Sequence, residues 1–126
     1  MFKRLVIFFL FVGITTYSQT SEISEKNKLL FDNAFFNAMK LKNLDDTKGA
    51  IKAFKKCIEL DPLISTPYYE IARIYKKTGK TILAEKNIKE ANRLSSKNKW
   101  YLYEYAQILF QNNKYQEAAK QYKKLV

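Results

Sequence analysis

The sequence predicts an all-α protein made of stacked antiparallel helix hairpins, and two observations support that fold class. First, small residues recur every 34 residues in two sets that lie 12 residues apart: Ala38, Ala72 and Ala106, and Ala50, Ala84 and Ala118. Second, each period holds two stretches with apolar residues at i, i+3, i+4 and i+7, which is typical of helices that bury one face. A fixed period of this length is typical of stacked repeats, which usually present a surface to partners.

The first 18 residues have the layout of a secretory signal peptide. A basic start precedes an almost unbroken apolar run, residues 5–14, which is too short to span a bilayer comfortably. Thr16 and Ser18 are small enough for the positions before a cleavage site, so we expect cleavage between Ser18 and Gln19. The alternative is an uncleaved membrane anchor.

This N-terminal layout resembles that of exported bacterial proteins. No cysteine lies near the predicted cleavage site, so lipid attachment there is not expected. We therefore expect an exported protein of the periplasm or cell envelope of a Gram-negative bacterium.

Residues 19–25 are polar and are expected to form a leader that precedes the repeats. Removal of the signal peptide leaves about 108 residues, which is near the usual size of one domain. No low-complexity linker divides them. We therefore expect a single repeat domain over residues 26–126, with units at about 31–64, 65–98 and 99–126.

The middle unit shows the hairpin pattern most clearly. Apolar side chains form a stripe on its first helix at Tyr68, Ile71, Ala72 and Tyr75, and on its second helix at Leu83, Ala84, Ile88 and Ala91. Small residues at two fixed points let the paired helices approach closely, while the larger residues fill the space between them.

These positions resemble the tetratricopeptide repeat family. Its pattern places small residues near the middle of the first helix and at the start of the second, and a proline near the end of the repeat. Residues 65–98 match it well, although Ser96 stands where the proline is expected. The first unit matches through its alanines and the Asp61-Pro62 pair, but has Asn37 at a usually apolar position. The resemblance implies a right-handed superhelical stack of about three units, the last one incomplete.

The turn inside each predicted hairpin also repeats. Asp45, Gly79 and Asn113 occupy one position at the 34-residue spacing, where the family commonly has glycine. Glycine, aspartate and asparagine all tolerate the left-handed backbone that such a turn often needs.

The last predicted helix starts near Lys114, and its apolar stripe is still running at Val126. Stacked repeats normally need a terminal cap with a polar outer face. We therefore expect this chain to be the front part of a longer protein. The alternative is a short protein that frays or self-associates through the uncapped C-terminal helix.

The charge balance is strongly basic, with 23 Lys and Arg against 12 Asp and Glu. Such a surplus can attract nucleic acid, anionic lipid or an acidic protein. The lysines are dispersed along the predicted helices, as at Lys52, Lys55, Lys56, Lys86 and Lys89, which favours solvated helix faces. No nucleic-acid-binding motif is present, so we expect no nucleic acid partner. Weak association with anionic membranes stays an alternative.

The sequence predicts no enzyme, no cofactor and no metal site. It has no histidine, which excludes sites and triads built on imidazole. Cys57 lies on the predicted buried stripe, so we interpret it as a small core residue rather than a reactive thiol. Gly79-Lys80-Thr81 imitates the end of a phosphate-binding loop, but it follows a helix and lacks the upstream glycine.

The family resemblance implies a partner-binding groove lined by the first helix of each unit. The predicted groove residues are Phe35, Met39, Tyr69, Arg73, Lys76, Tyr103, Gln107 and Phe110. Aromatic and arginine side chains are common anchors of interfaces. Three of the aromatic residues, Phe35, Tyr69 and Tyr103, form one row, which favours an apolar, extended or helical segment over an acidic tail. The alternative is that these rings pack only against neighbouring helices.

The function expected from these observations is that of a non-enzymatic scaffold of the cell envelope that binds a peptide or a partner protein in its groove. The alternative is an N-terminal repeat module of a larger envelope enzyme or cell-wall-binding protein.

Mass spectrometry of the exported protein tests the predicted signal peptide. We expect a mature chain that begins at Gln19, because Ser18 occupies the position before the cleavage site. An exported chain that still carries Met1 would contradict the prediction and favour the uncleaved anchor.

Overall fold

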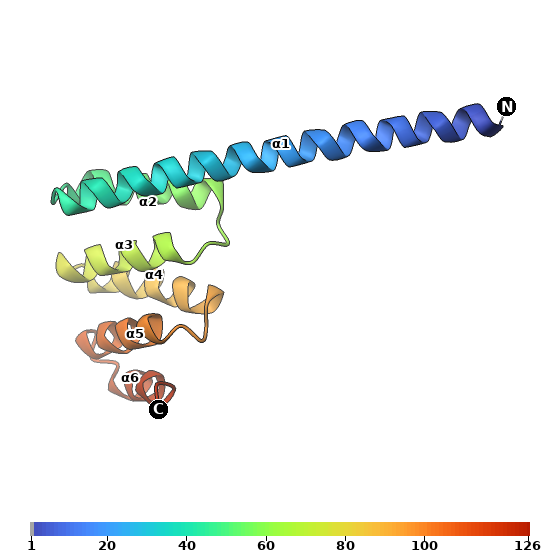
Figure 1. The fold of residues 1–126 in the computed structure, drawn as a ribbon. Helices are drawn as coiled ribbons and strands as arrows, with labels where there is room; N and C mark the ends of the chain where they lie inside the picture. The colour runs from blue at the N-terminus through green and yellow to red at the C-terminus, as the bar shows by residue number, and fades with distance from the viewer. Residues whose placement is uncertain (1) are drawn as a thin grey trace.

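The structure is a computed structural model that describes the backbone of residues 2–126 and the side chains of residues 22 and 24–126. Six helices follow one another along the described chain: α1 (Phe2–Asn43), α2 (Thr47–Leu60), α3 (Thr66–Lys77), α4 (Thr81–Leu94), α5 (Lys99–Gln111) and α6 (Tyr115–Lys123). They form three hairpins stacked one upon the next (Figure 1), and the described residues contain no strand. The predicted all-α stack of helix hairpins is confirmed.

The helix α1 is much longer than the others and extends well beyond α2 (Figure 1). Its C-terminal part packs against α2 and completes the first hairpin. The predicted signal peptide and polar leader fall on its N-terminal part, and the side chains of residues 1–21 lie outside the described residues. The signal peptide therefore stays a prediction. In the described part of the chain, no helix has the length and apolar character that a membrane crossing requires.

The alanines that define the repeat occupy equivalent buried positions. Five of the six are completely inaccessible and Ala118 is nearly so. Around them lie two clusters of larger side chains, one built on Phe54 and Ile71 and the other on Ile88, Ile108 and neighbours from α5. The small residues bring the two helices of each hairpin together, and the larger residues fill the interfaces between hairpins.

The three hairpin turns have the same backbone geometry. Asp45, Gly79 and Asn113 all have positive φ angles, of 57°, 78° and 62°. In each turn the amide of the following residue donates to the carbonyl five residues back, as Lys80 does to Tyr75 at 2.8 Å. This bond satisfies a carbonyl at the end of the helix and is typical of a helix that ends in a left-handed residue. The predicted left-handed turns are confirmed.

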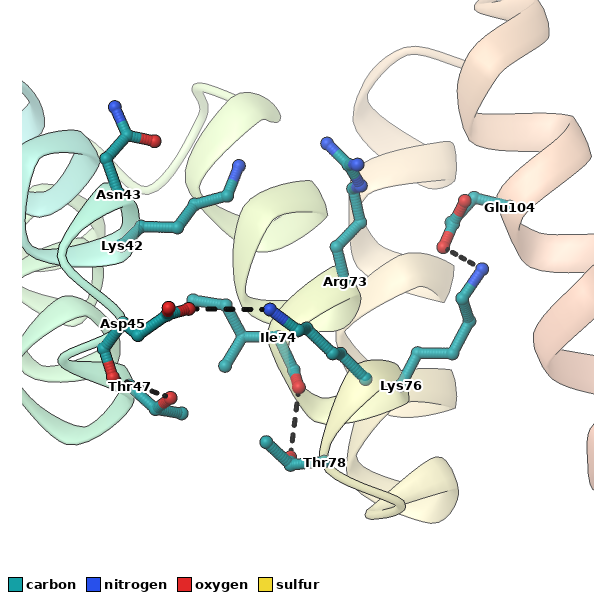
Figure 2. A pocket seen from close by; sticks show the side chains of 10 residues that line it. Lys42, Asn43, Asp45, Thr47, Arg73, Ile74, Lys76, Thr78 and Glu104 are labelled. Atoms are coloured by element: carbon teal, nitrogen blue, oxygen red, sulfur yellow. Dashed lines mark hydrogen bonds and ion pairs between the residues drawn. The ribbon is translucent and has the colours of Figure 1, made fainter.

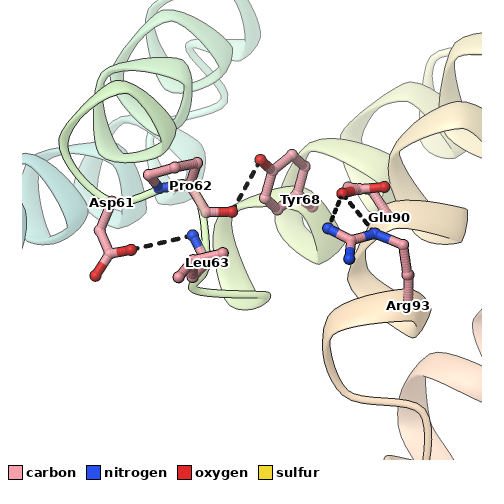
Figure 3. A network of polar contacts seen from close by, with 6 residues as sticks. All are labelled: Asp61, Pro62, Leu63, Tyr68, Glu90 and Arg93. Carbon is pink, nitrogen blue, oxygen red and sulfur yellow. Dashed lines mark hydrogen bonds and ion pairs between the residues drawn. The ribbon is translucent and has the colours of Figure 1, made fainter.

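The junction between the first two hairpins is held by local hydrogen bonds (Figure 3). The Asp61 carboxylate accepts from the Leu63 amide at 3.0 Å, and the Tyr68 hydroxyl donates to the Pro62 carbonyl at 3.1 Å. Pro67 lies in the first turn of α3, where its missing N–H breaks no helix hydrogen bond. These contacts set the angle at which α3 follows α2.

The turn at Gly79 predicts a purely conformational stability effect. A Cβ added at Gly79 meets no atom within 4 Å, so Gly79→Ala removes no contact. We expect it to lower the free energy of unfolding by about 1 kcal/mol, because alanine disfavours the left-handed region. Gly79→Asn is expected to lose less, since asparagine adopts that conformation at position 113. Urea unfolding followed by circular dichroism measures both variants, and an alanine variant as stable as the parent chain would contradict this account.

Candidate partner-binding groove

The predicted groove residues lie on α1, α3 and α5, the first helix of each hairpin, but their exposure differs along the stack. Phe35 and Met39 on α1 are half-buried and pack against the core cluster that contains Phe54. The Phe35 ring meets the Phe54 ring edge to face, with centroids 5.7 Å apart. At this end of the row the rings pack against the neighbouring helix, as the alternative interpretation of the sequence expected.

In the middle of the row, Tyr69 packs against a neighbouring ring and Arg73 is exposed to solvent. The Tyr69 ring is half-buried, with its centroid 4.6 Å from that of Tyr101. The Arg73 guanidinium lies 5.6 Å from the Tyr69 centroid and is solvent-exposed. Burial raises the pKa of the Tyr69 hydroxyl, while Arg73 acts in the opposite direction. The neutral Tyr69 ring therefore makes a cation–π contact with the Arg73 guanidinium.

The far end of the row is the most open. Tyr103 is 44% exposed, and its hydroxyl accepts a hydrogen bond from the Gln107 amide at 2.8 Å. Phe110 is 58% exposed and meets Tyr115 edge to face, with centroids 5.1 Å apart. The exposed groups of the predicted groove are therefore Arg73, Tyr103 and Phe110.

The structure also reveals two ion pairs, each between a half-buried lysine and a buried glutamate, that the sequence analysis did not identify. Lys42 Nζ lies 2.6 Å from Glu70 Oε2, and Lys76 Nζ lies 2.6 Å from Glu104 Oε1. Both glutamates are only 7% exposed. Each pair joins the first helix of one hairpin to the first helix of the next, and its members repeat at the 34-residue spacing.

The second pair is part of a small network. The contact between Lys76 and Glu104 is ionic, and the Lys76 ammonium also donates a hydrogen bond to the Gln107 side-chain oxygen at 2.8 Å. Gln107 in turn donates to Tyr103, so the buried pair is linked to an exposed aromatic residue of the groove. The network holds Gln107 and Tyr103 in place before any partner binds.

A cleft of about 610 Å³ opens beside these pairs, between the C-terminal ends of α1 and α3 and the facing side of α5 (Figure 2). Four cations line it, Lys42, Arg73, Lys76 and Lys77, together with the acids Asp45 and Glu104. Three of these cations pair with carboxylates, Lys77 through a 3.5 Å contact to Asp45. Arg73 makes no ion pair within the described chain, so it gives the cleft an uncompensated positive charge.

Two features of the described residues bear on metal binding and thiol chemistry. They contain no group of three His, Cys, Asp or Glu side chains that could hold a metal ion. Cys57 is completely buried, and burial raises the pKa of its thiol to about 11. The interpretation of Cys57 as a core residue is confirmed. Gly79 and Lys80 lie in the turn between α3 and α4, and Thr81 begins α4.

Comparison with known proteins gives one family match. A family model described as tetratricopeptide repeat matches residues 38–62 and 65–98. A comparison with curated protein sequences gives no significant match.

Several solved structures share the fold at low sequence identity. The second tetratricopeptide repeat domain of Spaghetti (RPAP3), bound to the HSP90 peptide SRMEEVD, is similar with a TM-score of 0.74 and 18% identity, over 81% of this chain and 94% of that one. MamA is similar with a TM-score of 0.71 and 17% identity, over 75% of this chain and 52% of that one. The TPR2B domain of yeast Sti1, in a complex with pHsp70, gives a TM-score of 0.70 and 16% identity, over 75% and 76% of the two chains. The match spans about half the length of MamA.

The buried ion pair between α3 and α5 predicts a large stability effect. Lys76→Met leaves the Glu104 carboxylate buried without its partner, so we expect the free energy of unfolding to fall by about 3 kcal/mol. Lys77→Met is the matched control, because its contact to Asp45 is exposed and worth about 0.5 kcal/mol or less. The double variant K76M/E104Q removes the unpaired charge and is expected to recover part of the loss. If Lys76→Met and Lys77→Met lower the free energy of unfolding equally in urea, the Lys76–Glu104 pair does not have the predicted effect on stability.

Proposed function

Because the chain belongs to the tetratricopeptide repeat family, we propose that it is a non-enzymatic scaffold of the bacterial cell envelope that binds a segment of a partner protein across α1, α3 and α5. The Spaghetti domain, which has the same fold, is bound to a peptide, and this supports the proposed class of partner. The signal-peptide layout of the first 18 residues supports the proposed location.

The observation that supports the groove most directly is the exposure of three of its predicted residues. Arg73, Tyr103 and Phe110 are exposed, although aromatic side chains gain most by burial. The Lys–Glu pairs join the first helices that carry these side chains. Exposed aromatic and arginine side chains have the usual composition of a binding hot spot.

The chemistry of these three residues limits the partner. Tyr103 and Phe110 offer apolar surface on α5, and the uncompensated Arg73 charge on α3 lies beside the cleft. The segment that fits both places an apolar side chain on the rings and one carboxylate near Arg73. A tail of several acidic residues fits less well, because Lys42 and Lys76 are already paired within the chain.

The alternative predicted from the sequence, an N-terminal module of a larger envelope enzyme or wall-binding protein, uses the same groove. It differs in what the repeat domain is joined to rather than in what the described residues bind. Sequencing of the reading frame around the chain separates the two, because further repeats favour the scaffold and a new domain favours the module.

Replacement of the exposed groove residues is expected to weaken partner capture without loss of structure. The double variant R73A/Y103A removes one cation and one ring, and we expect the affinity for a partner isolated from envelope extract to fall about 10-fold to 100-fold. Both side chains are exposed, so the circular dichroism spectrum is expected to stay unchanged.

Phe36→Ala is the matched control, since Phe36 is an exposed ring on α1 outside the predicted groove. Isothermal titration calorimetry measures the affinity of the partner for the parent chain, for R73A/Y103A and for F36A. If R73A/Y103A binds as tightly as the parent chain, or if F36A loses as much, the groove proposal fails.

A further inference from the structure

The lysines on the second helix of each hairpin form two columns rather than a dispersed set. Lys52, Lys86 and Lys120 share one position of the repeat at the 34-residue spacing, and Lys55, Lys89 and Lys123 share another. All six are exposed, and none forms an ion pair within the described chain. The same spacing that identifies the core alanines identifies these columns.

Helix geometry places both columns on the side of each second helix opposite its buried alanine, although Lys52 also borders a hollow lined by Ala34 and Asn37 of α1. Lys52 follows the buried Ala50 by two residues, which is about 200° around the helix, and Lys86 and Lys120 follow Ala84 and Ala118 in the same way. The second column lies nearly one turn further along each helix. Because the six positions recur at the 34-residue spacing, the lysines occupy equivalent sites on the outer sides of α2, α4 and α6.

Acidic residues on these helices do not neutralise the columns. Glu59 pairs with Lys56 at 3.3 Å, and Glu90 pairs with Arg93. Burial acts to raise the pKa of Glu85, but hydrogen bonds from Lys114 and Asn112 outweigh it and leave that pKa lowered. Glu85 is therefore already paired with Lys114, at 2.6 Å, although Lys89 lies near enough to contribute. Glu117 on α6 forms no ion pair in the described chain and is the one unpaired acid close to the columns.

We propose that this outer face, the lysine columns of α2, α4 and α6, binds the surface of an anionic phospholipid bilayer. Lysines near such a surface attract it by about 1 kcal/mol each, and the attraction depends on salt. The face also carries Ile82, which is 71% exposed one helical turn before Lys86, and the flanking Leu83, which is 43% exposed. Exposed apolar side chains among lysines are typical of helices that lie on a membrane interface.

The same observations disfavour nucleic acid as the occupant. Single-stranded nucleic acid is bound by stacking on aromatic side chains. Phe54 on α2 is buried and α4 has no aromatic residue. The exposed Tyr115 and Tyr122 of α6 lie on the side of that helix that carries the buried Ala118, not with the lysines. Base and phosphate recognition by paired hydrogen bonds uses arginine, and both columns consist of lysine. The outer face is thus distinct in place and chemistry from the groove on α1, α3 and α5.

Co-sedimentation of the full chain with vesicles tests the proposal. The probes are phosphatidylcholine vesicles with and without phosphatidylglycerol, at low salt and at about 1 M salt, where the Debye length falls to about 3 Å. We expect binding to the anionic vesicles that high salt abolishes. Neutral vesicles measure any contribution of the N-terminal apolar run, which every variant shares.

The column variant K52E/K86E/K120E is expected to lower the partition coefficient on anionic vesicles by at least about 100-fold. The matched control K40E/K97E/K99E changes the net charge equally at exposed lysines away from the outer face, and is expected to keep most of the binding. Ile82→Ser is expected to lower the partition coefficient on anionic vesicles by up to about 10-fold and to leave the affinity for a short oligonucleotide unchanged. Circular dichroism checks that each variant is folded.

Four outcomes overturn the proposal. They are no binding of the parent chain to anionic vesicles, binding that high salt leaves unchanged, equal losses in the column and control variants, and tighter column-dependent binding to the oligonucleotide than to vesicles. The groove variant R73A/Y103A is expected to bind vesicles normally, so failure of this proposal and failure of the groove proposal are distinguishable.

Discussion

The close approach of two helices at the inaccessible alanines is the constraint on which the rest of the structure depends. Ala72 and Ala84 are completely inaccessible between α3 and α4, and a larger side chain in a well-packed interface of this kind forces the helices apart. The same spacing in every hairpin gives every hairpin the same shape. Identical shapes then stack at a constant interval, which turns a period in the sequence into rows of side chains on the surface.

The buried ion pairs add a second constraint, on how one hairpin meets the next. A buried Lys–Glu pair gains little net stability over well-packed apolar residues, because both ions lose their hydration. It does penalise any shift that separates the partners. Lys42 reaches Glu70 and Lys76 reaches Glu104 across equivalent interfaces, so the first helices are fixed in one register. That register places Tyr69, Arg73 and Tyr103 relative to one another.

Much of the fold could be predicted from the sequence because its signals are local and repeated. The alanine spacing predicted the hairpins, and the residues at positions 45, 79 and 113 predicted the left-handed turns. Glu70 and Glu104 could not be recognised individually, since a glutamate on a helix is usually exposed; their shared spacing was the available signal. The lysine columns were interpreted as dispersed for the same reason, because composition counts charges without aligning them to the period.

The groove was predictable in position but not in exposure. The equivalent positions of Phe35, Tyr69 and Tyr103 follow from the period alone. Their different environments depend on neighbours that differ between units, such as Phe54 beside Phe35 and Tyr101 beside Tyr69. A repeat pattern therefore gives the place of a side chain, and the residues of the adjoining helix decide how much of it stays open.

The burial of Cys57 has a consequence for where such a chain can exist. A lone cysteine in an oxidising compartment can form mixed disulfides with other proteins or small thiols, and the thiolate is the reactive form. With a pKa of about 11 and no accessible surface, the Cys57 thiol stays protonated and out of reach while the first hairpin is folded. The folded domain is thereby compatible with oxidising surroundings. Only unfolding of the first hairpin exposes the Cys57 thiol to disulfide formation.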